Sequence, residues 1–384
     1  MSGDVGQYLQ SVRKRRGFTQ RELAEASRVS LSFIRKLEQG ERDDARMETL
    51  RRLAVALGCP LTTLLGPAPT PPVSRDGELW EPTRVAIAAM EPNENADSSG
   101  TLAGSLAAAV QLYHDNRYER LAQVLPRLID EGRAAEPVIR SRILQLAGSV
   151  MVQTRQLRPA RIALEQSVAD AERTGNAVDS ASAIVTLCWL MIVERQFDAV
   201  RELATRWADR IEPRLSVATE REISTWGWLL LRGSAAAIRD NRPDEADDMM
   251  RLAQAGAVVM KRDVGGYQDY WTRFGPATVA MKRVENAVVD DQPDLALRLA
   301  REVPAGLRPT SDNRNRHLLD VASAHLELRR PDTAFDVLRQ LSIEAGPWLA
   351  EQRLARDLMG RLIAERRTLT AEMRHLADLI DLEY

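Results

Sequence analysis

The chain of 384 residues lacks the features that mark several protein classes. Its only cysteines, Cys59 and Cys188, lie far apart in apolar stretches, so neither a disulfide framework nor a C-x-x-C metal motif can form from them. No stretch approaches the ~20 consecutive apolar residues that a membrane-spanning helix needs. The first residues, MSGDVGQYLQ, lack the apolar segment of a secretory signal peptide. We therefore expect a cytoplasmic protein without a membrane partner.

Catalytic motifs are missing as well. The sequence contains no H-E-x-x-H, no G-x-S-x-G and no Gly-rich phosphate loop. Among its four histidines, His317 and His325 can share a helix face, but no cysteine pair or acidic cluster accompanies them as further metal ligands. The acidic pair Asp290-Asp291 adjoins a predicted turn and is expected to be solvated. We predict that the chain is not an enzyme and uses no catalytic residue, cofactor or metal.

Charged residues, in contrast, are present and unevenly distributed along the chain. The length predicts two or more domains. Residues 1–66 carry 12 basic and 8 acidic residues, whereas the remainder carries 41 basic and 47 acidic residues. A basic head on an acidic body indicates a nucleic-acid contact confined to the N-terminal end. Arginine supplies 49 of the 53 basic residues, which suggests a GC-rich genome, so the arginine content alone says little.

The N-terminal segment has the pattern of a small bundle of short helices. Apolar residues between positions 5 and 12 recur on one helix face and leave Arg13 and its basic neighbours outside it. Thr19 and Glu22 have the spacing of a capping box, which opens a second helix. Ser30 is placed to cap a third helix, SLSFIRKLEQ, and a fourth follows in METLRRLAVALG.

The third of these helices points to a function. At 100° per residue, Ile34 and Leu37 face inward on the preceding helix. A helix with a polar outer face can lie in the major groove of DNA, where arginine or lysine donates to guanine. The alternative is an ordinary solvated surface. The outer face carries Ser32, Arg35, Lys36 and Gln39, with Ser30 and Leu31 at the exposed N-terminal tip.

The string FTQRELAEASRVSLSFIRKLEQGER resembles the XRE family of phage and bacterial repressors, and the resemblance continues to Leu65. It implies a five-helix helix-turn-helix domain in which the tip and outer face of the third helix read bases. It also implies a DNA-backbone contact by Gln20 and a minor-groove contact by Arg46. Many relatives carry Gln at the helix tip, where this chain has Leu31 and Ser32, so the operator sequence cannot be transferred. The expected DNA-contact set is Gln20, Ser30, Leu31, Ser32, Arg35, Lys36, Gln39, Arg42 and Arg46.

One such domain would discriminate weakly between DNA sequences, because each good bidentate base contact contributes roughly 1–3 kcal/mol. We therefore expect a homodimer that reads two half-sites on double-stranded DNA, spaced by about one DNA turn or a multiple of it. The protein would then be associated with the nucleoid.

A Pro-rich segment follows the N-terminal domain. Residues 66–76 read GPAPTPPVSRD, which cannot continue a helix, and EPNENADSSG is polar enough for a flexible loop. Between them, residues 79–90 can form a short helix anchored by Trp80. We predict a DNA-binding domain at 1–66, a linker with a short helix at 67–100, and a repeat domain at 101–384.

The C-terminal region is helical and repetitive. Turn-like clusters such as RQLRPA, DNRPDEA and RRPDTA recur every 38 to 50 residues, each closing on an apolar or small residue. Three units match the tetratricopeptide template in register. We predict an all-α chain whose body stacks six helical hairpins into a right-handed superhelix, with the first helices lining its concave surface. The alternative is an irregular helical bundle. The closing residues are Leu121, Ala160, Ala199, Ala246, Ala296 and Ala334.

A narrower resemblance lies near the end of the body. The strings YWTRFGPATVAMKRVENAVV and RNRHLLDVASAHLELRRPDTA resemble the sensor half of actinobacterial XRE–tetratricopeptide regulators. Relatives often have Asn and His shortly after the Phe-Gly-Pro, where this chain has Thr278 and Lys282. The resemblance therefore implies a sensor domain whose effector differs from that of its relatives.

Aromatic residues, only 5% of the chain, concentrate between positions 189 and 271, with polar residues nearby. Aromatic walls with a few polar anchors suit a peptide or a small molecule, although any one aromatic side chain can instead fill the core. We expect a DNA-binding transcription regulator whose repeats mediate dimerisation and bind such an effector. The alternative is a constitutive DNA-bound adaptor whose repeats dock another protein. The candidate effector residues are Trp189, Trp226, Tyr270, Arg273, Thr278, Lys282, Asn286, Asn313 and Arg316.

Overall fold

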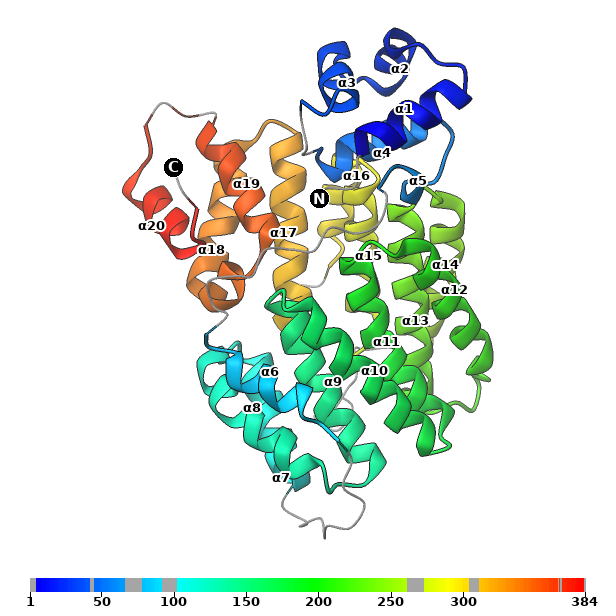
Figure 1. Cartoon of the computed structure of the whole chain (residues 1–384), viewed down its shortest axis with the longest axis vertical. Helices are drawn as coiled ribbons and strands as arrows, with labels where there is room; N and C mark the ends of the chain where they lie inside the picture. Colours follow the sequence, from blue (N-terminus) through cyan, green and yellow to red (C-terminus); the bar gives the residue numbers. More distant parts are fainter. Residues whose placement is uncertain are drawn as a thin grey trace.

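The structure is a computed structural model that describes residues 5–41, 45–65, 78–91, 102–260, 273–303, 311–364, 366 and 368–382. These residues form twenty helices and no strand, which confirms the predicted all-α class (Figure 1). No helix among them is long and apolar enough to cross a membrane.

Five helices form the N-terminal domain around one apolar core. The capping box predicted at the second helix is present, since the Thr19 Oγ1 accepts from the amide of Glu22 and the Glu22 carboxylate accepts from the amide of Thr19. Ser30 caps the third helix through the amide of Phe33. The helices are α1 (Val5–Arg15), α2 (Gln20–Ser27), α3 (Leu31–Glu38), α4 (Met47–Ala56) and α5 (Thr62–Leu65).

Arg13 corrects one expectation about this domain. Its side chain was expected outside the apolar face, yet only 8% of the residue is exposed. The guanidinium instead forms a two-pronged pair with Glu38, from Nε at 2.6 Å and from Nη2 at 2.8 Å. These hydrogen bonds raise the pKa of Arg13. A buried charge is retained only when it is paired and hydrogen-bonded, so this pair ties α1 to α3.

The described residues of the C-terminal body contain six helical hairpins, whose turns lie at the predicted turn clusters. Two further helices, α19 (Arg353–Ala364) and α20 (Ala371–Leu379), follow them. The hairpin helices are α7 (Leu102–His114), α8 (Tyr118–Gly132), α9 (Pro137–Gln153), α10 (Leu157–Arg173), α11 (Ala177–Val193), α12 (Phe197–Arg210), α13 (Glu220–Arg239), α14 (Pro243–Met260), α15 (Pro276–Val289), α16 (Pro293–Ala300), α17 (Ser311–Glu327) and α18 (Pro331–Ala350).

All six hairpins turn in the same way. At each turn one residue adopts a left-handed conformation, and the next amide donates to the carbonyl five residues earlier, as in a Schellman motif. Five residues beyond the left-handed one, an apolar side chain is fully buried in each hairpin. In the third hairpin this is Val200, whereas the sequence analysis selected its neighbour Ala199. The left-handed residues are Asn116, Arg155, Arg195, Asn241, Asp291 and Arg329.

Small residues bring the two helices of a hairpin together. A Cβ atom added at Gly148 on α9 would lie 2.5 Å from side-chain atoms of Leu164 on α10. One added at Gly233 on α13 would lie 2.5 Å from the sulfur of Met249 on α14. Real Cβ contacts are longer than this, so glycine is what permits these approaches.

The helix α6 (Glu81–Ala88) belongs to the body. The sequence analysis expected a short helix anchored by Trp80 and placed it within the linker. Trp80 is 1% exposed and meets the ring of Tyr118 on α8 edge-on, with centroids 6.4 Å apart. Helix α6 also packs against α8 and α10, so it covers the first repeats.

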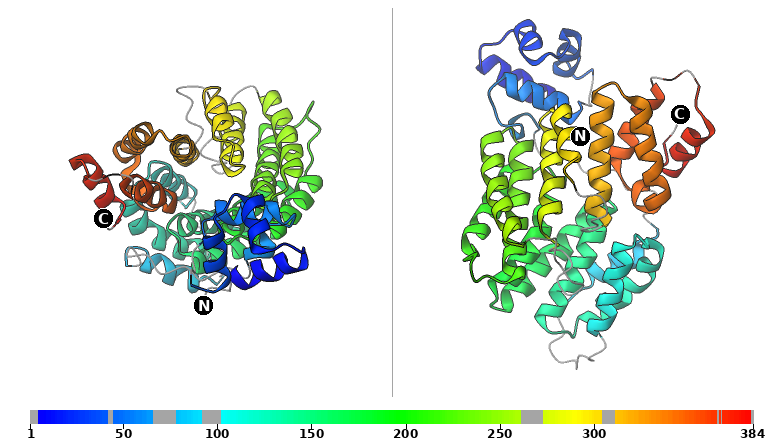
Figure 2. Two further views of the ribbon diagram at one scale, coloured as in Figure 1. Left: turned by 90° about the horizontal axis from the view of Figure 1, so that it is seen from above. Right: turned by 180° about the vertical axis from the view of Figure 1, so that it is seen from behind.

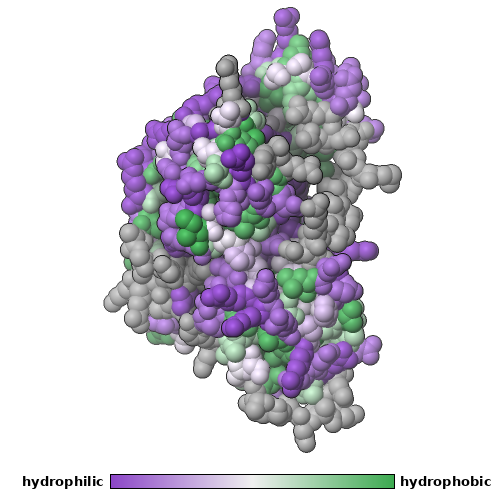
Figure 3. Space-filling model, turned by 90° about the vertical axis from the view of Figure 1, so that its left-hand side faces the viewer, coloured by the Kyte–Doolittle hydropathy of each residue, from purple (hydrophilic) through white to green (hydrophobic). Residues whose placement is uncertain are grey.

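The hairpins follow one another along a curve, which is plain when the molecule is seen from above (Figure 2). The last helices come to lie over the first ones, since buried residues of α6–α10 and α17–α20 belong to one continuous apolar cluster. On the side shown in Figure 3, hydrophilic side chains cover most of the described surface and hydrophobic ones form small separate patches. The curvature thus places an interior chamber at the centre of the body.

Candidate functional site

The outer face of α3 is open to solvent. Ile34 and Leu37 are buried as expected, at 0% and 1% exposure. Helices α2 and α3 lie on the side of the N-terminal domain away from the body, whereas α4 and α5 lie toward it (Figure 1). No described part of the body therefore covers this face in the single chain. Its exposed residues are Ser30, Ser32, Arg35, Lys36 and Gln39, and Leu31 at the tip is half-buried.

The remaining residues of the expected DNA-contact set lie around α3. Gln20 is half-buried at the start of α2, and its Nε2 donates to the carboxylate of Glu38 at 2.8 Å. Glu38 therefore receives both Arg13 and Gln20 and positions them beside α3. Arg46 is exposed immediately before α4. Arg42 lies outside the described residues.

The N-terminal domain contacts the body through α4. Arg51 donates from Nη1 to the carbonyl oxygen of Val289 and from Nη2 to the carboxylate of Asp290, at the end of α15. Arg52 donates to Asp291 at 2.9 Å. The pair Asp290-Asp291 was expected to be solvated, but the side chain of Asp290 is only 23% exposed. The expectation failed because the N-terminal domain supplies Arg51 and Arg52 to this turn, and the sequence of the turn alone gives no sign of that contact.

Three carboxylates gather at the same interface, one each from Glu48, Asp291 and Glu327, with ligand atoms within 4.8 Å of one another. Burial first, and then the negative charge of Glu327, raise the pKa of Glu48. The arginine Arg52 pairs with Glu48 and Asp291, and Arg361 pairs with Glu327 at 2.6 Å. These two arginines offset part of the charge of the three carboxylates, and the group forms an ion-pair network that joins α4, the turn after α15, α17 and α19.

The body contains a partly open chamber of about 320 Å³. Its walls come from all six first helices, α7, α9, α11, α13, α15 and α17, as the sequence analysis expected of the concave surface. The junction of α18 and α19 closes it, with Trp348 and Arg353 among the lining residues. These two residues could not be predicted from the sequence, because the return of the last helices over the first depends on the accumulated curvature of the array.

The candidate effector residues divide into two groups. Trp189, Lys282, Asn313 and Arg316 line the chamber. The other described candidates do not line it: Trp226 is 5% exposed and faces Gly256 in the core, and Thr278 is fully buried. Asn286 donates to Ser234 at 2.8 Å, and the carbonyl of Arg273 accepts from Trp228 Nε1 at 2.8 Å. Tyr270 lies outside the described residues.

Arg232 on α13 lines the chamber and contacts two of its tryptophans, although it was not among the candidate effector residues. Its guanidinium carbon lies 5.0 Å from the ring centre of Trp228 and 5.8 Å from that of Trp189. Its Nε donates to the carbonyl of Val185 at 3.3 Å. Burial lowers the pKa of Arg232 to about 10, which leaves it charged at neutral pH. An arginine held over two indole rings is fixed in place by cation–π attraction.

A second group of charges lies beside it. The Glu285 carboxylate accepts from Lys282 at 2.7 Å and also from Arg239. The positive charges of Lys282 and Arg239 hold the pKa of Glu285 well below its ordinary value despite its burial. On the neighbouring helix α17, burial raises the pKa of Asp312 to about 7. Of the carboxyl groups that line the chamber, Glu285 is thus fully paired and Asp312 is readily protonated.

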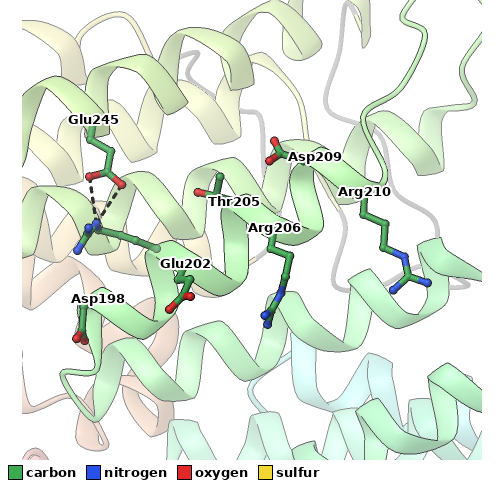
Figure 4. Close-up of a pocket in the computed structure, with 8 residues that line it drawn as sticks. Asp198, Glu202, Thr205, Arg206, Asp209, Arg210 and Glu245 are labelled. Carbon is green, nitrogen blue, oxygen red and sulfur yellow. Dashed lines mark hydrogen bonds and ion pairs between the residues drawn. The ribbon is translucent and has the colours of Figure 1, made fainter.

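The outer surface carries a wider depression of about 860 Å³ along α12 (Figure 4). Arg201 lies in it and pairs with Glu245 at 3.0 Å and with Asp240 at 2.9 Å. Its other lining residues lie along α12 and carry charges of both signs, apart from one threonine (Figure 4). Exposed charges of both signs are typical of a solvated helix face, so the chamber of the body is the better candidate for a ligand.

Comparisons with known proteins agree with the N-terminal assignment. Residues 9–64 match the family model described as helix-turn-helix. No curated protein matched the chain. Among solved structures, the apo form of ComR from S. thermophilus is similar to 83% of this chain and all of its own, with 13% sequence identity and a TM-score of 0.32. Residues 9–64 therefore form a helix-turn-helix DNA-binding domain, and this chain joins that domain to an all-helical repeat body.

Proposed function

We propose that this protein is a transcription regulator that binds specific DNA sequences through α3 and responds to an effector in the chamber. Arg35 and Lys36 are the exposed cations of α3 and would donate to base edges in the major groove, with Ser30, Leu31, Ser32 and Gln39 around them. Gln20, Arg42 and Arg46 would contact the DNA backbone or minor groove at the flanks.

One observation supports a link between effector and DNA binding above all others. Helix α15 carries Lys282 and Glu285 into the chamber, and its C-terminal end holds Arg51 of the DNA-binding domain. A ligand that contacts Lys282 can therefore favour one position of α15, and with it one position of the domain. The shift requires that the ligand bind one arrangement more tightly than the other.

The DNA-binding form would be a homodimer. A single domain of this size makes few base contacts, and each contributes roughly 1–3 kcal/mol, so two half-sites are needed for useful selectivity. The repeat body is the expected source of the dimer contact, since it provides most of the surface of the chain.

The alternative of a constitutive protein-docking adaptor has less support. The chamber lies between six helices, and about 320 Å³ is near the lower end of the range of small-molecule pockets, about 300–1,000 Å³. A protein partner would need an open groove with a larger contact area.

Selection of bound sequences from random DNA tests this function. The full chain should enrich one motif made of two related half-sites whose centres are about one DNA turn, or a multiple of it, apart. Sedimentation of the complex should give two chains per site. Enrichment of no motif would overturn sequence-specific binding, and a single half-site bound by one chain would overturn the dimer.

Melting temperatures measured with fractions of a cell extract distinguish effector sensing from protein docking by the body. Small molecules below about 1 kDa should raise the melting temperature of the chain if it senses an effector, since a ligand that binds only the folded state stabilises it. Stabilisation by the protein fraction alone would favour the adaptor.

A further inference from the structure

We propose that the effector of this chamber is a small molecule with an anionic group, a carboxylate, phosphate or sulfonate, that binds Arg232. The inference rests on the proposed function, in which the chamber is the effector site, and specifies the chemistry of its ligand.

The guanidinium of Arg232 has hydrogen-bond donors that the described residues leave unused. Of its guanidinium nitrogens, Nε is used by the carbonyl of Val185, while Nη1 and Nη2 have no hydrogen-bond acceptor among the described residues. The rings of Trp228 and Trp189 hold the guanidinium in a fixed place, and Arg232 lines the chamber. A fixed guanidinium with two unused nitrogens matches the two oxygens of a carboxylate or phosphate.

Two other residues that line the chamber have a buried polar atom without a hydrogen-bond partner. The indole Nε1 of Trp348 is buried without a hydrogen-bond partner, and an indole nitrogen can only donate. Oδ1 of Asp312 is likewise buried and unpartnered. The pKa of Asp312, raised to about 7 by burial, allows this carboxyl to carry a proton and donate as well. A buried donor without an acceptor is costly, so a ligand rich in acceptor oxygens would stabilise Arg232 and the Trp348 indole, and Asp312 when its carboxyl is protonated.

The charge balance points the same way. Six cationic side chains line the chamber against three acidic ones, Glu285, Asp312 and Glu351. Glu285 is already shared by two of the cations. After burial, the strongest influences on the pKa of Arg155 are four other arginines, led by Arg353, and they lower it further. The cationic lining residues are Arg155, Arg232, Arg239, Lys282, Arg316 and Arg353.

Size limits the ligand further. About 320 Å³ holds a compact molecule or a peptide of a few residues, and not an extended peptide that runs along the whole superhelix. The polar and aromatic wall suits a ring that bears the anionic group, with the ring against side chains such as Ile192 and Leu354.

A charge-matched set of probes tests the proposal on the full chain. We would measure binding of 1-naphthoate, 1-naphthyl phosphate and 1-naphthalenesulfonate by calorimetry, beside neutral 1-naphthamide and cationic 1-naphthylmethylammonium. At least one anion should bind about tenfold or more tightly than both counterparts, because charge-assisted hydrogen bonds exceed neutral ones by such a factor.

The variant Arg232→Gln should weaken binding of that anion about tenfold or more, and Arg232→Lys should weaken it less because it keeps the charge. Arg206→Gln, at an exposed arginine on α12, is the matched control and should bind as the wild type does. Thermal unfolding of each variant shows whether it is folded.

Two outcomes would overturn the proposal: anions that bind no better than the neutral and cationic probes, or anion binding that survives Arg232→Gln. Affinity for the selected operator, measured without probe on the same preparations, separates the two hypotheses. Intact operator binding with no anion preference refutes the anionic effector alone, whereas loss of operator binding by the wild type refutes the proposed function.

Discussion

Arg51 of the DNA-binding domain donates to Asp290, the residue that follows the chamber-lining helix α15. Only 10% of the Arg51 side chain is exposed, and the same guanidinium also reaches the carbonyl of Val289. The DNA-binding domain and the end of the helix that carries Lys282 are thus joined by Arg51, beside the contact of Arg52 with Asp291. This relationship gives the proposed regulation a physical route.

Removal of Asp290 should loosen the DNA-binding domain on the body, although the contacts of Arg51 with Val289 and of Arg52 with Asp291 remain. Asp290→Ala leaves Arg51 without its carboxylate, which costs about 1.5–3 kcal/mol of docking energy for a charged hydrogen bond. Spin labels at Lys14→Cys on α1 and Arg206→Cys on α12, diluted with unlabelled chain, report the distance between domain and body. The wild type should give one narrow distance distribution and Asp290→Ala a broad one.

Asp248→Ala is the control for that measurement, since Asp248 is an exposed carboxylate paired only with Arg251 on its own helix. It should keep the narrow distribution. A narrow distribution in Asp290→Ala would show that the Arg51 contact does not hold the domain in place.

Close packing within the second hairpin predicts a cost for a single methyl group. In Gly148→Ala the new Cβ would lie 2.5 Å from Leu164, so the two helices must separate. We expect a loss of about 1–3 kcal/mol in the free energy of unfolding, measured with urea. Gly104→Ala, on α7 with open space around it, should be neutral or stabilising by up to about 1 kcal/mol. Equal effects of both substitutions would refute the close approach.

His317 predicts a pH dependence of stability. Burial first, then the charges of Lys282 and Arg314, lower its pKa to about 4, below its unfolded value of about 6.5. Between these values the unfolded state binds a proton that the folded state excludes, so stability falls as pH drops through this window. From pH 7 to pH 5 the wild type should lose about 2 kcal/mol more than His317→Gln.

Urea unfolding at pH 7, 6 and 5 measures this difference. His375→Gln, at an exposed histidine on α20, serves as the control and should follow the wild type across the series. Parallel curves for the wild type and His317→Gln would contradict the burial argument.

The positions of the hairpins could be predicted from sequence because each turn depends on local chemistry. Residues such as Asn116 and Asp291 adopt the left-handed conformation more easily than most, and an apolar side chain follows at a fixed distance. The register failed only where RQFDAV offers both Ala199 and Val200. The buried residue is Val200, which follows the left-handed Arg195 by five positions. This spacing can be used only when the backbone conformation of Arg195 is known.

The chamber was only partly predictable, because its composition depends on contacts between distant repeats. Trp226 and Trp228 lie two residues apart on α13, a helix that is buried on most sides, so periodicity gives no basis for choosing the one that faces inward. Trp348 and Arg353 enter the chamber only because the last helices return over the first. The interface of Arg51 with Asp290 spans 239 residues of sequence and has no local signal.

The N-terminal surface was the most predictable part. The capping residues Thr19 and Ser30 fix where α2 and α3 begin, and periodicity then determines which residues face outward. The buried pair of Arg13 and Glu38 was missed, since a long side chain can fold back under its own helix.

Operator affinity of the double variant Arg35→Ala/Lys36→Ala tests the central claim most directly. A fluorescence anisotropy titration with the selected operator should show binding weakened about 100-fold or more, with unchanged thermal unfolding, since two groups that donate to bases are lost. The salt dependence should also become shallower if either group contacts a phosphate. The double variant Arg127→Ala/Arg206→Ala, at exposed arginines of the body, should bind the operator as the wild type does. Unchanged operator affinity in Arg35→Ala/Lys36→Ala would contradict the assignment of α3 as the DNA-reading helix.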